Sequence, residues 1–126
     1  MNSIQSIYPK GEKWNIPISW GVRAGDFIYF SGGGGLYEDD SASVEKSLRE
    51  FFEQEKKRFA EIGITYKNIV KVTAWLSLDY KHYETWNKVY RDYFSDPFPA
   101  RSTVPWELEG GKRLGFESEM VAYVGK

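Results

Sequence analysis

The chain has 126 residues, enough for one domain with a single hydrophobic core, and we expect one domain over residues 1–126. Its 17 basic and 18 acidic residues leave a net charge of −1, which argues against a nucleic-acid or anionic-membrane partner. The absence of cysteine excludes disulfides and thiolate chemistry. No apolar run is long enough for a membrane span and the N-terminus lacks a signal-peptide pattern, so we expect a soluble, cytoplasmic protein.

The first third of the chain predicts short strands. Alternating and β-rich segments place them near Ile4–Tyr8, Ser19–Ala24 and Asp26–Phe30, with a turn at Gly25-Asp26. The run Gly32-Gly33-Gly34-Gly35 follows directly. It permits either a sharp bend or the close approach of a ligand, and we favour a loose turn. It is not a phosphate-binding loop, because no Lys-Ser/Thr pair or helix start follows at the required spacing.

The middle of the chain predicts an amphipathic helix. Ser41 or Ser43 would cap its start, and it would run to about Ile62 and stop at Gly63. At 3.6-residue spacing, one face collects the apolar side chains of Val44, Leu48, Phe51, Phe52, Phe59 and Ile62.

A long strand and a second helix come next. Tyr66–Leu78 is rich in β-forming residues, and Asp79 would cap a helix over Tyr80–Phe94. The last two strands are expected near Ser102–Leu108 and Gly115–Val124, with a turn over residues 109–112. The side chains predicted to point inward from the second helix are those of Tyr83, Trp86, Val89, Tyr90 and Tyr93.

The resulting order, β-β-β-α-β-α-β-β, predicts an α+β fold in which two helices cover one face of a sheet. The other face must also be hidden. Val70, Val72, Ala74 and Leu76 alternate with Ile69, Thr73 and Trp75, so both faces of this strand are largely apolar. Since only two helices are expected, we predict a closed homo-oligomer.

Arg101 is the strongest candidate for a functional residue. The rigid Pro99-Ala100 lead-in restricts the backbone before it, so the guanidinium can be aimed at a carboxylate ligand. The alternative is a structural ion pair. Glu117 and Glu119 lie on one face of the last strand, where one of them could pair with Arg101 or a lysine. His82, the only histidine, is expected to be exposed. We predict no metal site, because the histidine has no partner motif and carboxylates are not clustered.

Five segments of the chain carry a family resemblance. They are residues 24–32 (AGDFIYFSG), 68–76 (NIVKVTAWL), 86–94 (WNKVYRDYF), 98–105 (FPARSTVP) and 116–122 (FESEMVA). In order and spacing they resemble the RidA/YjgF/L-PSP family over roughly Pro17–Tyr123. The resemblance implies a chorismate-mutase-like α+β domain with a mixed sheet and two helices on one face. It also implies a homotrimeric barrel with clefts between subunits.

The resemblance also implies roles for individual residues. Arg101 corresponds to the arginine that binds the substrate carboxylate, and Glu117 to the glutamate that positions water. Ser31, Gly32 and Asn87 match further substrate-binding positions, and Ile18 occupies another. Two places depart from the imine-hydrolysing members: Ile18 stands where they have tyrosine, and Gly33 where they have glutamine. Trp14 or Trp20 could replace the lost aromatic wall beside the Ile18 position.

From this pattern we predict a cofactor-free and metal-independent enamine/imine deaminase. It would hydrolyse a 2-imino acid, a small carboxylated metabolite, to a 2-keto acid and ammonia. The alternative is a non-catalytic trimeric protein of the same family that binds or senses small molecules, which Ile18 and Gly33 favour. RNA cleavage, an activity of some relatives, is disfavoured by the neutral charge of the chain.

Overall fold

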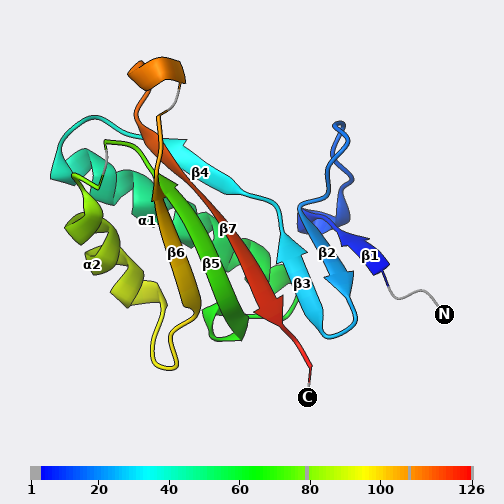
Figure 1. The fold of residues 1–126 in the computed structure, drawn as a ribbon. Coiled ribbons are helices and arrows are strands. Elements are labelled where there is room, and N and C mark those ends of the chain that lie inside the picture. Colours follow the sequence, from blue (N-terminus) through cyan, green and yellow to red (C-terminus); the bar gives the residue numbers. More distant parts are fainter. Residues whose placement is uncertain (1–3, 79, 108, 126) are drawn as a thin grey trace.

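The structure is a computed structural model, and it describes residues 4–78, 80–107 and 109–125 (Figure 1). In this part of the chain, seven strands form one sheet. The elements are β1 (Ile4–Ile7), β2 (Gly21–Ala24), β3 (Phe27–Phe30), β4 (Gly33–Leu36), α1 (Ser41–Glu61), β5 (Ile69–Leu76), α2 (Tyr83–Tyr93), β6 (Ala100–Pro105) and β7 (Gly115–Tyr123).

The sheet is mixed, as expected. Its strand order is β1-β2-β3-β7-β5-β6; β5 and β6 are parallel, and the other pairs are antiparallel. The last strand of the chain is therefore central. β3 pairs with the C-terminal end of β7 and β4 with its N-terminal end, so β3 and β4 lie end to end along one side of β7. The break between them falls at Ser31-Gly32.

The glycine run does not form the loose turn that we predicted. Gly33–Leu36 is strand β4, which pairs with β7 in the sheet and also contacts the first helix. A Cβ atom on Gly34 would overlap the carbonyl oxygen of Phe116, and one on Gly35 would lie 2.6 Å from Ser47 Oγ on α1. The glycines therefore allow β4 to pack closely against β7 and α1, and they do not form a bend.

Helix α1 begins and ends through local hydrogen bonds. Its cap is Asp40 rather than Ser41 or Ser43, and the Asp40 side chain accepts a hydrogen bond from the backbone N–H of Ser43. At the other end, Gly63 has a φ of +78°, and its N–H donates to the Ala60 carbonyl. The expected stop at Gly63 is confirmed, because a left-handed residue there closes the last turn.

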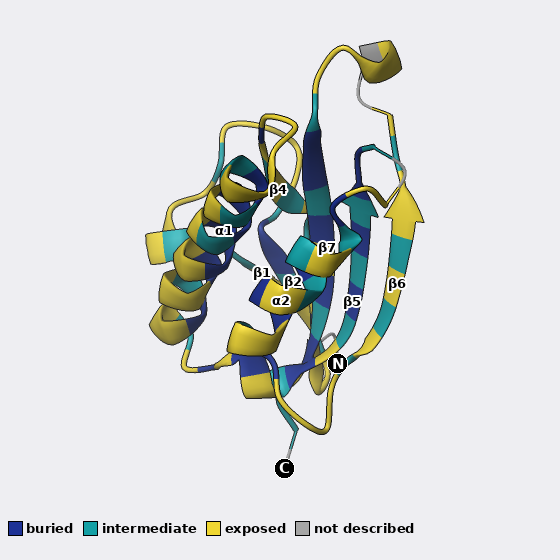
Figure 2. Ribbon diagram, turned by 90° about the vertical axis from the view of Figure 1, so that its left-hand side faces the viewer, coloured by how far each residue is buried: buried dark blue, intermediate teal, exposed yellow. Residues whose placement is uncertain are grey.

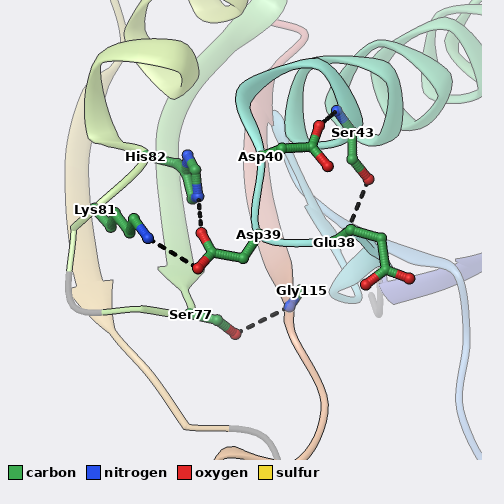
Figure 3. A network of polar contacts seen from close by, with 8 residues as sticks. All are labelled: Glu38, Asp39, Asp40, Ser43, Ser77, Lys81, His82 and Gly115. Atoms are coloured by element: carbon green, nitrogen blue, oxygen red, sulfur yellow. Dashed lines mark hydrogen bonds and ion pairs between the residues drawn. The ribbon is translucent and has the colours of Figure 1, made fainter.

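Helix α2 starts later than predicted, at Tyr83, with His82 as its N-cap; the expected cap Asp79 lies outside the described residues. His82 is not exposed but buried, at 8% exposure. Its Nε2 lies 2.8 Å from Asp39 Oδ1, and Lys81 Nζ donates to the other oxygen of the same carboxylate (Figure 3). Asp39 thus joins the segment before α1 to the start of α2. Hydrogen bonds with Lys81 and His82 hold the pKa of Asp39 below its usual value.

Both helices lie on the same side of the sheet (Figure 2). The core between the layers includes Leu48, Phe52, Val72, Trp86 and Val89, all with no exposed surface. The opposite face has no covering layer within the described chain. It carries exposed apolar side chains, including Phe27, Tyr29, Val104 and Tyr123.

The two faces of β5 differ in one detail from the prediction. A bulge between Ile69 and Lys71 shifts the register against β7. Ile69 consequently shares the buried face with Val72, whereas Val70 is 41% exposed. The extra residue of the bulge has reversed the alternation that we had assigned to this end of the strand.

Candidate functional site

Arg101 lies on the edge strand β6 and points toward helix α2. Its register partner Val72 is fully buried on the helix-covered face of the sheet. The Arg101 guanidinium carbon is 5.6 Å from the ring centres of Tyr83 and Trp86 and 4.7 Å from that of Tyr90. These rings stand on one side of α2 because their spacing, i, i+3 and i+7, matches the helical repeat. Together the three rings make cation–π contacts with the guanidinium.

Two polar side chains of α2 orient the same guanidinium. Arg101 Nη2 donates to Tyr83 Oη at 2.9 Å and to Asn87 Oδ1 at 2.8 Å. The Asn87 amide is itself fixed, because its Nδ2 donates to Glu84 Oε1 at 3.2 Å. Asn87 is therefore brought to Arg101, as the resemblance implied, and its visible role is to aim the arginine.

Arg101 forms no ion pair with any carboxylate in the described part of the chain. The alternative of a structural ion pair is therefore not observed among the described residues. Its neighbours Tyr83 and Asn87 are neutral acceptors, so the positive charge is oriented but not neutralised. A guanidinium in this state can bind an anionic ligand.

Two openings border Arg101. One, of about 440 Å³, is lined by Tyr80, Tyr83, Arg101 and Thr103. The other, of about 240 Å³, is lined by Asn87, Tyr90, Arg91, Phe98, Pro99 and Arg101. Either volume is large enough for a metabolite of a few carbon atoms.

Unpaired polar atoms gather around this arginine. Among the described residues, the buried Trp86 Nε1, Tyr90 Oη and Thr103 Oγ1 have no hydrogen-bond partner. Burial raises the pKa of Tyr90 to about 12, although the charge of Arg101 lowers it. Unpaired buried polar groups cost stability unless a ligand or water meets them.

The second group of predicted residues lies at the break between β3 and β4. A Cβ atom on Gly32 would be 3.3 Å from both Cγ and Cδ of Glu117, so this carboxylate packs directly over the glycine. Ser31 Oγ donates to the Ser19 carbonyl at 2.6 Å, which ties Ser31 to the segment that carries Ile18. Ile18 itself is 46% exposed. The structure thus brings Ile18, Ser31, Gly32 and Glu117 to one region.

Glu117 is half-buried and has no hydrogen-bond donor or ion-pair partner among the residues that the structure describes. The pairing with Arg101 or a lysine that we considered is therefore absent there. Glu119 lies on the same face of β7 and is exposed. Glu117 is the carboxylate that packs against Gly32, which favours it over Glu119.

Trp20 does not form the aromatic wall that we suggested beside Ile18. It is 2% exposed and its ring packs against Phe30 and Phe59 in the core. Its Nε1 donates to Glu55 Oε2 at 3.2 Å, and Glu55 also accepts from Arg58. Burial raises the pKa of Glu55 despite the nearby guanidinium. Trp14 is only partly buried and stays available for the wall.

Within one chain the two groups face opposite sides of the sheet. Arg101 is aligned with Val72, and Val72 with Met120, on the helix side. Glu117 is aligned with Trp75, and Trp75 with Val104, on the uncovered side. Because side chains in register share a face, Arg101 and Glu117 of the same chain cannot meet across the sheet.

A family model described as endoribonuclease L-PSP matches residues 15–124. The chain belongs to this family. The resemblance found in the five segments is thereby confirmed over nearly the whole sequence.

Named relatives and solved structures agree with this assignment. A human protein named 2-iminobutanoate/2-iminopropanoate deaminase is 33% identical over 114 residues, covering 86% of this chain and 81% of the relative. An Arabidopsis thaliana protein named Reactive Intermediate Deaminase A, chloroplastic, is 35% identical over 91 residues; these are 69% of this chain and 48% of that protein, about half its length. The structure of YyfA, a Rid-family protein from Yersinia pestis, aligns over 97% of this chain and 100% of its own, with a TM-score of 0.75 and 30% identity.

In the described part of the chain, no three side chains of His, Cys, Asp or Glu gather as metal ligands do. None of the described helices has both the length and the apolar character needed to cross a membrane.

Proposed function

We propose that this protein hydrolyses enamine or imine metabolites, converting a 2-imino acid to a 2-keto acid and ammonia. The observation that carries the proposal is Arg101: a cation held by Tyr83 and Asn87, without a carboxylate partner in the described chain, at the border of two cavities. The names of the human and Arabidopsis relatives support the same chemistry. The ligand would be a small carboxylated metabolite, and the reaction needs no cofactor.

In the proposed reaction, Arg101 binds the substrate carboxylate and thereby places the C=N carbon. Glu117 orients a water molecule and accepts one of its protons as the oxygen attacks that carbon. The C=N double bond becomes the C–N single bond of a carbinolamine. Glu117 delivers this proton to the nitrogen, which completes the neutral carbinolamine. It then takes the carbinolamine hydroxyl proton and passes it to the same nitrogen, so the C–N bond breaks, ammonia leaves and the C=O bond forms.

This mechanism requires two chains, because Arg101 and Glu117 of one chain lie on opposite faces of the sheet. We propose a homotrimer in which Arg101 and Asn87 of one subunit face Glu117, Gly32, Ser31 and Ile18 of its neighbour. The uncovered sheet face, with exposed Phe27, Tyr29 and Val104, supplies apolar surface for such an interface. Light scattering should then give about 44 kDa, three times the chain mass of 14.6 kDa.

Mixed trimers test both the reaction and the shared site. Arg101→Ala and Glu117→Gln variants, each inactive alone, are unfolded, mixed in equal amounts and refolded together. If a site takes its arginine from one subunit and its glutamate from the next, about a quarter of the sites in a random mixture are intact. Ammonia release from freshly generated 2-iminobutanoate should return to about that fraction of the wild-type rate. No recovery would show that the two residues do not act across an interface.

The alternative function is the binding of a small molecule without turnover. Gly33 favours it: where the imine-hydrolysing relatives would carry glutamine, a Cβ atom here would lie 3.1 Å from the Phe51 ring of α1. A glutamine could not be accommodated without moving that ring. If the wild-type protein binds 2-keto acids but releases no ammonia from 2-iminobutanoate, the binding function is correct. We place the protein in the cytoplasm as part of the same proposal.

A further inference from the structure

The hydroxyl of Tyr83 holds a hydrogen atom that nothing in the described chain accepts. Arg101 Nη2 donates to Tyr83 Oη at 2.9 Å, so the tyrosine oxygen is the acceptor in that contact. A phenol oxygen that accepts one hydrogen bond still has its own O–H to donate. Tyr83 lines the 440 Å³ cavity beside Arg101, so this free donor lies at a place that a ligand can enter.

Tyr80 lines the same cavity but differs in its hydrogen bonding. Its hydroxyl donates to the backbone carbonyl of Thr103 at 2.7 Å, so its proton is already used. The two rings meet edge to face, with centroids 5.6 Å apart. Of these two neighbouring tyrosines, Tyr83 is the one whose hydroxyl proton has no acceptor among the described residues.

Other unused polar groups border the same cavity. Both Nη2 hydrogens of Arg101 are taken by Tyr83 and Asn87, whereas its Nη1 and Nε have no acceptor in the described part of the chain. Thr103 Oγ1, on the same face of β6 as Arg101, is buried without a partner. A planar anion with two acceptor oxygens satisfies adjacent N–H and O–H donors of this kind at once.

We propose that Tyr83 is a substrate-binding residue and forms the second half of the carboxylate receptor. One oxygen of the ligand carboxylate accepts from Arg101 Nη1 and the other from the Tyr83 hydroxyl, while Asn87 keeps the guanidinium in place. That the ligand is a 2-imino or 2-keto acid rests on the proposed function. The receptor itself rests on the geometry around Arg101.

The test compares Tyr83→Phe with the matched control Tyr80→Phe. Both variants lose one hydroxyl from the same cavity and keep the aromatic ring. Calorimetric titration with 2-oxobutanoate should show that Tyr83→Phe raises Kd about tenfold, whereas Tyr80→Phe changes it less than about twofold. With the uncharged 2-oxobutanamide, the effect of Tyr83→Phe should shrink to about threefold or less, because a hydrogen bond to a neutral acceptor is weaker.

Equal affinity of Tyr83→Phe and wild type for 2-oxobutanoate would overturn the proposal, as would an equal loss in Tyr80→Phe or no binding by the wild type. Soaked crystals of the wild type give a readout without any variant: a carboxylate beyond hydrogen-bond distance of the Tyr83 hydroxyl would also overturn it. Ammonia release is measured separately. If binding depends on Tyr83 but no ammonia is released, the proposed function is wrong and the carboxylate receptor is retained. If ammonia is released but binding does not depend on Tyr83, the proposed function is retained and the role of Tyr83 is wrong.

Discussion

Replacing Arg101 by alanine should separate ligand binding from stability. The guanidinium contacts three aromatic rings and donates two hydrogen bonds, so its removal also affects the fold. Cation–π contacts at partly exposed sites contribute about 0.5–1 kcal/mol each. Water can replace the two hydrogen bonds once the side chain is gone, so the loss of folding free energy should be modest, about 2 kcal/mol.

The loss of ligand binding should be larger. Arg101 lies beside the two cavities without an ion-pair partner among the described residues, and removing a charge-assisted contact to a carboxylate costs about 2–4 kcal/mol. Affinity for 2-oxobutanoate should therefore fall between about 30-fold and 1000-fold. Arg101→Lys keeps the charge but loses the planar fork, and its affinity should lie between those of wild type and Arg101→Ala.

Two measurements decide the matter. Denaturant unfolding at a fixed protein concentration gives the change in stability, and calorimetric titration of the folded variant gives the change in affinity. If Arg101→Ala unfolds under native conditions, or folds and binds 2-oxobutanoate as well as wild type, Arg101 is a structural residue and the carboxylate receptor is wrong. If Arg101→Lys binds as tightly as wild type, the planar fork has no role.

Three further outcomes are expected. Glu117→Gln should bind 2-oxobutanoate normally but lose ammonia release, whereas the control Glu119→Gln should keep both; the opposite pattern would make Glu119 the base. Burial raises the pKa of Glu55 in the folded protein, so ionising this carboxyl group opposes folding. The stability contributed by protonated Glu55 is fully present below the pKa of Glu55 in the unfolded chain, and it is lost as the pH rises through the pKa of Glu55 in the folded protein. The unfolding free energy of wild type relative to Glu55→Gln should fall over that range, and a constant difference would contradict this account. Gly34→Ala should lower the free energy of unfolding by about 3 kcal/mol, because the added methyl group would overlap the backbone of Phe116. Gly33→Ala should lower it clearly less, because its methyl group would meet only the edge of the Phe51 ring. Equal losses in thermal unfolding would refute the packing argument.

Local patterns in the sequence predicted most of the fold. The apolar spacing of α1 and α2, the stop at Gly63 and the strand content all follow from interactions between residues that are close in the chain. The proposal that Arg101 binds a carboxylate also came from a local motif, Pro99-Ala100-Arg101. The roles proposed for Asn87 and Ser31 came only through the family resemblance, since neither residue type is distinctive by itself.

Tertiary structure decided what depends on distant neighbours. The glycines of β4 form a strand only because β7, some 80 residues later, offers an edge to pair with and α1 leaves no room for side chains. His82 is buried where Tyr37 and Asp39 reach it from another segment. The opposite facing of Arg101 and Glu117 follows from register across β5, which no local pattern contains. Side-chain periodicity is a property of one segment. Strand pairing, burial and the sheet face that a side chain occupies depend on which segments meet in the folded chain.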